Sequence, residues 1–224
     1  MKALAIDSAS SYITVSAKNE DNCVTLSLDI GPKQSQELLP AIDYVLSKVG
    51  LEPNELDYIT LCKGPGTFTG LRLAFAAAKA ISLAFKTPVY AVSTLECYAF
   101  AYKNFCGQVV STIDAKKDQF FAAIYKNGTE LFEPQDTSAE KVIEKLTPQE
   151  PILCTGSDAK TFAQILKEKN SNLNVIYFES EANPAHCLFA IAESMIEQKK
   201  EPLKDFEGPE YLRKSEAELA LEKK

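Results

Sequence analysis

An internal duplication is the strongest constraint on the fold, because the same order of predicted elements occurs twice along the 224 residues. Each half predicts a run of short strands, then a helix, a strand, a helix, a strand and a final helix. The first strand of each half also ends in the same dipeptide, Ile6-Asp7 and Ile113-Asp114. A repeat of this size predicts two tandem α/β domains with mixed sheets, at residues 1–104 and 105–224, hinged near Asn104–Gly107.

Hydrophobic periodicity and turn residues define the elements of each half. In the first half, strands are predicted at Lys2–Asp7, Tyr12–Ala17, Cys23–Leu28, Asp57–Cys62 and Pro88–Val92, and helices at Gln36–Val49, Thr69–Phe85 and Thr94–Lys103. In the second half, strands are predicted at Gln108–Asp114, Gln119–Tyr125, Thr129–Phe132, Pro151–Thr155 and Asn174–Phe178, and helices at Ser138–Leu146, Ser157–Lys169 and Pro184–Gln198. From Ile196 onward charged residues dominate, so we expect a solvated charged tail with Tyr211-Leu212 as a short apolar anchor.

The charge balance argues against direct nucleic-acid binding. Lys and Arg total 24 against 31 Asp and Glu, which gives a net charge of −7 at pH 7. An autonomous nucleic-acid binder needs a basic patch to displace the counterions of phosphate, whereas a subunit whose partner holds the nucleic acid does not. No apolar run approaches the ~18 residues that span a bilayer, and the start MKALAID lacks the pattern of a signal peptide. We therefore expect a cytoplasmic protein without membrane contact.

Cysteine and histidine usage limits the available chemistry. The six cysteines contain no C-x-x-C pair, so in a cytosolic chain they are interpreted as small buried hydrophobes. His186 is the single histidine, and any zinc site or Ser–His–Asp triad would depend on it. We expect plain packing or solvent exposure for His186, and no metal site and no cofactor.

A glycine-rich stretch, KGPGTFTG, lies between a predicted strand and a predicted helix. Glycine permits unusual backbone angles, and a helix start offers free N–H groups to an anion. The stretch is neither a P-loop nor a G-x-G-x-x-G motif. Two interpretations remain open: a tight turn capped by Thr67 or Thr69, or an anion, nucleotide or partner contact at Gly64, Gly66 and Thr67.

The helix that follows is rich in alanine and apolar nearly all round. Such a helix must be covered on more than one side. Its own sheet can cover one side, and either the Gln36–Val49 helix or a second protein covers the other. Arg72 and Lys79 mark its wetter edge.

Asp7 and Asp114 are the remaining candidates for chemistry. At strand ends facing a cleft, paired carboxylates could hold Mg²⁺ for phosphoryl transfer, which would make the chain a small Mg/ATP-dependent phosphotransferase. Neither aspartate is followed by a glycine that would let the backbone wrap a phosphate. Turn capping by each side chain is the favoured interpretation.

Six segments carry a resemblance to a known family: ALAIDSAS, QSQELLPAI, GPGTFTGLRLAFAAAKAIS, VSTLE, DAKKDQFFAAIY and PEYLR. In this order, over essentially the whole chain, they closely resemble the TsaB (YeaZ) family. The resemblance implies a tandem duplicated actin/hexokinase-like fold of ribonuclease H-like domains. It also implies a non-catalytic subunit needed for threonylcarbamoyladenosine modification of tRNA.

The resemblance implies partners as well. TsaB proteins pair with the larger paralogue TsaD, which transfers threonylcarbamoyl from threonylcarbamoyl-AMP to adenosine 37 of tRNA, and the ATPase TsaE joins them. A homodimer through the same surface, and contact with tRNA only through the complex, are expected too. The resemblance implies no catalytic residue. It implies no metal either, because Gln34 stands where relatives often carry histidine. The old family label glycoprotease suggests a peptidase, but this sequence lacks a set of zinc ligands. The implied partner surface is Leu38, Leu39, Ile42, Leu71, Arg72, Phe75 and Lys79.

Overall fold

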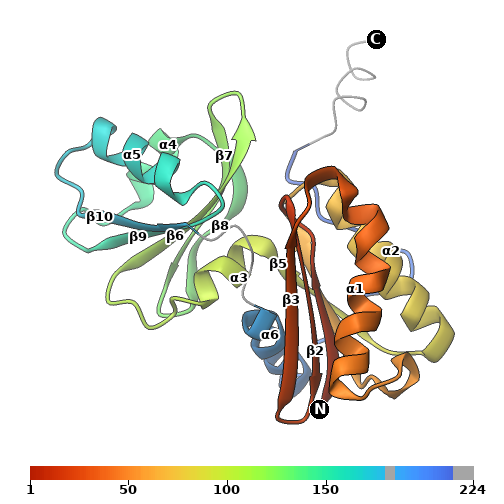
Figure 1. Cartoon of the computed structure of the whole chain (residues 1–224). Coiled ribbons are helices and arrows are strands. Elements are labelled where there is room, and N and C mark those ends of the chain that lie inside the picture. The colour runs from red at the N-terminus through yellow and green to blue at the C-terminus, as the bar shows by residue number, and fades with distance from the viewer. Residues whose placement is uncertain (180–184, 214–224) are drawn as a thin grey trace.

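A computed structural model describes residues 1–179 and 185–213 and contains two five-stranded sheets of the same topology (Figure 1). The first has the order β3-β2-β1-β4-β5, and the second, read in the same direction, has the order β8-β7-β6-β9-β10. In both sheets the first three strands are antiparallel and the last two run parallel to the central strand. This is the tandem duplicated actin-like α/β fold, so the predicted fold class is confirmed.

Every predicted element is present, with ends shifted by a few residues. The strands are β1 Lys2–Asp7, β2 Tyr12–Asn19, β3 Asn22–Asp29, β4 Tyr58–Gly64, β5 Val89–Ser93, β6 Gln108–Lys116, β7 Gln119–Lys126, β8 Thr129–Thr137, β9 Ile152–Gly156 and β10 Val175–Glu179. The helices are α1 Gln34–Val49, α2 Phe68–Phe85, α3 Thr94–Phe100, α4 Ala139–Lys145, α5 Ala159–Lys169 and α6 Ala185–Glu197. Pro184, the predicted start of the last helix, lies outside the described residues.

Pro40 lies inside α1, although proline is best tolerated in the first turn of a helix. A short 3-10 segment, Gly31–Lys33, leads directly into α1, so the helix begins at Gln34 and Pro40 lies inside it. Proline removes the hydrogen bond to the carbonyl four residues earlier, here that of Gln36. Both residues are exposed, so water can satisfy this carbonyl.

Helices α1 and α2 cover one face of the first sheet, where Leu4 and Ile6 of β1 join their core. Helices α4 and α5 cover the corresponding face of the second sheet. Alternate side chains of β1, Ala3 and Ala5, point to the opposite face and pack in a separate cluster. The first sheet is therefore buried on both sides.

The opposite faces are covered by exchanged helices. Helix α6 follows the second sheet in sequence but packs on β1, β4 and β5 of the first, where Leu188 and Phe189 join the core. Helix α3 follows the first sheet and contacts β6, β7 and β9 of the second, with Leu95 and Ala99 in that core. Figure 1 shows α3 at the junction and α6 beside the first sheet. The division at residue 104 stays a prediction, and these two helices cross it.

The predicted lack of a membrane-length apolar segment is wrong for α2. Within the described residues, this helix of 18 residues is long and apolar enough to cross a bilayer by length and composition. Its contacts with α1 and β4 place it instead in a helix layer on the sheet.

Candidate functional site

The turns after β1 and β6 repeat one hydrogen-bond pattern. Asp7 Oδ1 accepts the backbone N–H of Ala9 at 2.9 Å, and Asp114 Oδ1 accepts that of Lys116 at 2.7 Å. Each aspartate therefore bonds the amide two residues ahead, the geometry of an Asx turn. The favoured interpretation of both residues as turn caps is confirmed.

A cleft of about 410 Å³ lies between these turns, with Ser10 and Thr67 on one wall and Asp114, Lys116 and Ser157 on the other. Asp114 lines this cleft, but Asp7 is 2% exposed and does not. The expectation that paired carboxylates face the cleft is wrong for Asp7, because its side chain is buried.

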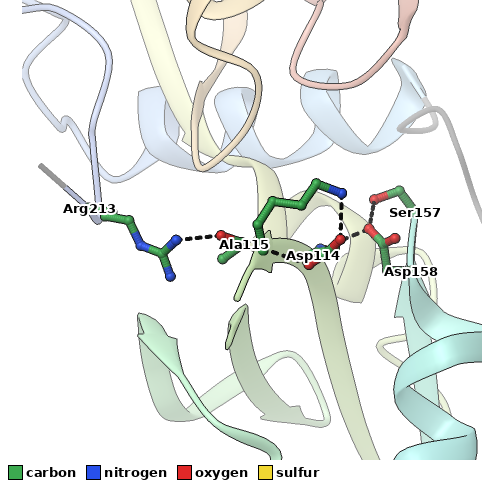
Figure 2. Close-up of polar contacts among 6 residues, drawn as sticks. Asp114, Ala115, Ser157, Asp158 and Arg213 are labelled. Carbon is green, nitrogen blue, oxygen red and sulfur yellow. Dashed lines mark hydrogen bonds and ion pairs between the residues drawn. The ribbon is translucent and has the colours of Figure 1, made fainter. Parts of the chain in front are cut away.

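Asp114, the aspartate that reaches the cleft, is already engaged by neighbouring groups. Asp114 Oδ2 is 2.6 Å from Lys116 Nζ, and the Asp114 N–H donates to Asp158 Oδ2 at 2.8 Å, an oxygen that also accepts the Ser157 hydroxyl at 2.7 Å. Figure 2 shows this chain of contacts. Burial raises the pKa of Asp114, but the hydrogen bonds and charge of Lys116 outweigh it and hold the pKa below its ordinary value. Over residues 1–179 and 185–213, the fold brings no three His, Cys, Asp or Glu side chains together as a metal cluster.

The glycine-rich turn packs against the chain itself. The Thr67 N–H donates to the Ala9 carbonyl at 2.7 Å, and a Cβ on Gly66 would lie 2.5 Å from that same oxygen. The Lys63 carbonyl accepts the N–H of Glu210 from the C-terminal segment at 2.8 Å. Glycine is therefore required here for close packing. Gly66 and Thr67 still line the cleft, so the proposed anion or nucleotide contact at Gly64, Gly66 and Thr67 stays a prediction.

The partner surface expected on α1 and α2 mixes buried and exposed positions. Leu38, Ile42, Leu71 and Phe75 are at most 5% exposed and belong to the core of this chain. Among the other three expected residues, Leu39 is 64% exposed, Arg72 is exposed and Lys79 is half-buried. The partner surface on these helices stays a prediction, and its four buried side chains expose little area of their own to a partner.

A different stripe of α2 reaches the surface, and the sequence interpretation missed it. The exposed positions Arg72, Ala76, Ala80 and Leu83 recur at helical spacing and lie along one side of the helix. The buried stripe is built from equally apolar residues, which is why hydrophobicity alone did not separate the two. The sequence signal that could have separated them is the helical spacing of Ala76, Ala80 and Leu83 from the charged residue Arg72.

The cysteines divide into two groups. Cys23 and Cys106 are exposed, so the expectation that all six are buried is wrong. Burial raises the pKa of Cys154 and of Cys187 to about 12, which leaves both as neutral thiols near pH 7. His186 is exposed, one of the two outcomes expected for it.

The two sheets of the same topology place the chain in the class of proteins with a tandem duplicated actin-like fold. A family model described as "TsaD: tRNA N6-adenosine threonylcarbamoyltransferase" matches residues 31–221. Two solved structures of Pseudomonas aeruginosa proteins share the fold. The match to one of them, "YeaZ", covers 94% of this chain and 99% of that chain, with a TM-score of 0.73 and 21% sequence identity. The match to the other, described as "an uncharacterized protein with similarity to peptidase YEAZ", covers 95% of this chain and 99% of that chain, with a TM-score of 0.77 and 22% sequence identity.

Curated relatives narrow the class to one family. "tRNA threonylcarbamoyladenosine biosynthesis protein TsaB" of Bacillus subtilis is 27% identical over 97% of this chain and 96% of its own length. The protein of the same name from Buchnera aphidicola subsp. Acyrthosiphon pisum is 31% identical over 75% of this chain and 80% of its own. The chain belongs to the TsaB/YeaZ family.

Proposed function

We propose that this chain is a non-catalytic subunit in the biosynthesis of threonylcarbamoyladenosine in tRNA, acting as the partner of a TsaD transferase. TsaD would carry threonylcarbamoyl from threonylcarbamoyl-AMP to adenosine 37, and this chain would stabilise its active state, with TsaE joining the pair. The names of the relatives and the match to the TsaD family model support the pathway. The surface of α1 and α2 supports the role of a partner.

That surface is the observation that carries the proposal. Five of the large hydrophobic side chains that are exposed in the described structure lie on these two helices: Leu39, Tyr44, Phe68, Leu83 and Phe85. The small exposed residues Ala76 and Ala80 lie between Arg72 and Leu83 and allow a second helix to approach closely. Exposed apolar surface of this kind marks a protein interface, for which we expect about 800 Å² per partner.

The cleft supports the non-catalytic half of the proposal. The carboxylate of Asp114, which lines the cleft, is engaged by Lys116, and Asp7 is buried. A peptidase role is not favoured, because the described residues assemble no ligand cluster and the buried thiols that could act as nucleophiles have raised pKa values.

Ala76→Glu tests the interface without disturbing the core. Ala76 is exposed, so the monomer should keep its stability, whereas a glutamate there would bury an unpaired charge against a close partner helix. We expect the affinity for the cognate TsaD, measured by titration calorimetry and light scattering, to fall at least about thirtyfold. Leu39→Glu should act in the same way. The matched control is Gln164→Glu, at an exposed position of α5.

A functional assay completes the test. TsaD, TsaE, threonylcarbamoyl-AMP and unmodified tRNA are combined with this chain or with each variant, and modified adenosine is counted by mass spectrometry. The proposal requires little product without this chain, full product with the Gln164→Glu control, and a loss with Ala76→Glu that parallels the loss of binding. Unchanged binding by Ala76→Glu and Leu39→Glu would refute the interface, and product formed equally without this chain would refute the role.

A further inference from the structure

The chain after α6 forms a strap, residues 201–213, that runs back along the first half of the molecule. The Leu203 N–H donates to the Val89 carbonyl of the edge strand β5 at 2.7 Å. Lys79 Nζ of α2 then donates to the carbonyl of Asp205, and the Glu210 N–H donates to the Lys63 carbonyl at 2.8 Å. The strap is thus held at successive points along α2 and the ends of β4 and β5.

Tyr211 is the anchor of the strap on the first half. Its ring stacks on Phe68 with centroids 4.9 Å apart, and its hydroxyl accepts a hydrogen bond from Arg72 Nε at 3.0 Å. The Arg72 guanidinium also lies over the Phe68 ring at 3.7 Å. The strap passes so close to Gly64 that only glycine fits there, because a Cβ would lie 2.5 Å from the Glu210 carbonyl oxygen.

Arg213 is the anchor on the second half. Its guanidinium makes two hydrogen bonds to the Asp136 carboxylate of β8, at 2.6 and 2.8 Å, the rigid bidentate arrangement of the strongest ion pairs. It also donates to the Ala115 carbonyl beside the cleft (Figure 2) and lies 5.8 Å from the centre of the Phe121 ring. The pair is less than one-third exposed.

The two anchors hold opposite walls of the cleft. Phe68 directly follows Thr67 of one wall, while Phe121 lines the other wall and Ala115 lies between two of its residues. Tyr211 and Arg213 are two residues apart, so the chain between them spans at most about 7 Å. We propose that the strap is a latch: Tyr211 holds one wall, Arg213 holds the other, and the Arg213–Asp136 pair sets how far the cleft opens.

The latch is tested by a distance across the cleft in the full chain. Spin labels at Lys33→Cys and Lys160→Cys, two exposed positions in different halves, are introduced after Cys23→Ser and Cys106→Ser remove the exposed thiols. Arg213→Gln and Asp136→Asn each break the ion pair, and Tyr211→Ala releases the other anchor. With any of the three, the distance distribution should broaden toward longer values. Glu150→Gln is the control, because it breaks a similarly exposed 2.6 Å pair with Lys126 inside the second half.

Amide exchange by mass spectrometry gives an independent readout on the same proteins. The latch predicts about tenfold faster exchange in the strap and at both walls, residues 64–70 and 113–118, with Arg213→Gln and with Asp136→Asn. The double variant should behave like the single ones. Faster exchange confined to the strap, with an unchanged distance across the cleft, would show that the strap is only a local anchor and would overturn the latch. Circular dichroism confirms that each variant is folded.

Discussion

Helices α1 and α2 occupy the same places on the first sheet that α4 and α5 occupy on the second, but the two pairs differ in length and outer surface. The first pair has 16 and 18 residues, and the second has 7 and 11. The exposed positions of α5 carry polar side chains such as Lys160, Gln164 and Lys167, whereas α1 and α2 expose Leu39 and Leu83. The outer surface of α4 and α5 is polar and solvated, whereas α1 and α2 expose apolar area that a partner can cover.

The inner faces of the two pairs do not differ in this way. Phe75 of α2 is 4% exposed, and Phe162 of α5 is fully buried beside Phe120, with ring centroids 4.7 Å apart. Each helix is thus fixed to its own sheet by an ordinary hydrophobic core. The duplication preserved the packing of the helices on the sheets, and the outer surfaces diverged.

The largest expected effect tests whether the inner faces are equivalent. Phe75→Ala and Phe162→Ala should each lower the free energy of unfolding by about 3–5 kcal/mol, because each leaves a cavity in a packed core. Urea denaturation of the full chain measures both. A loss below about 1 kcal/mol for Phe75→Ala alone would mean that α2 is held mainly by its outer face. Because Phe75 is buried in the core, a charge placed there would disturb the fold and cannot serve to test the partner interface.

A smaller effect should come from the helix that crosses between the halves. Glu193 of α6 forms an ion pair with Lys18 and accepts the Tyr58 hydroxyl at 2.9 Å, which ties α6 to the first sheet. Glu193→Gln should lower the free energy of unfolding by about 1–3 kcal/mol, since a half-buried network loses its charge. The control is Glu197→Gln in the exposed last turn of the same helix. Equal stability of the two variants in urea denaturation would show that packing alone holds α6.

The outer faces of α4 and α5 predict an effect of pH on stability. A hydrogen bond from Lys169 of α5, and a second from Ser138, lower the pKa of Glu140 of α4 to about 2 from its ordinary 4.5. A group with a lowered folded-state pKa contributes stability above its unfolded pKa and loses it as the pH falls through the folded one. Glu140→Gln should therefore flatten the decline in stability between pH 4.5 and about 2. Thermal melts across this range measure the slope, and Glu144→Gln, exposed on the same helix, is the control for the loss of a surface charge.

The smallest expected effect concerns the apolar outer face itself. Leu83→Gln should change the free energy of unfolding of the isolated chain by less than about 0.5 kcal/mol, since the side chain is 75% exposed. Thermal unfolding at several protein concentrations measures it. A loss above about 1 kcal/mol that grows with concentration would show that the chain already pairs with itself through this face.

The sequence was sufficient for the order and type of the elements because their signals are local. Alternating apolar residues defined β2 and β3, and the Asn127-Gly128 turn has positive φ angles of 51° and 75°, as a two-residue hairpin requires. Ser93 caps α3 by accepting the N–H of Glu96, three residues further along the chain. The Asx turns at Asp7 and Asp114 are equally local, since donor and acceptor lie two residues apart.

Exposure was less predictable, because it depends on which neighbour covers a side chain. On α2, apolar residues occupy both the buried and the exposed stripe. Leu71 and Phe75, which the sequence interpretation placed on the partner surface, lie in the buried one. The described part of the expected solvated tail, residues 201–213, is mostly exposed, as predicted. Its anchor, Tyr211, was identified correctly, but the contacts that hold it come from Phe68 and Arg72, more than a hundred residues away in the chain.

The sequence by itself determined the duplication, the strands and helices of each half, the capped turns and the likeness to one family, because all of these are written in short-range patterns. Only the tertiary structure decided that α3 and α6 are exchanged between the halves, that Asp7 is closed off while Asp114 is not, and that residues 201–213 bridge the cleft. These features depend on pairs such as Arg213 and Asp136. The free energy of such a pair is gained only when the fold brings together groups that are distant along the chain.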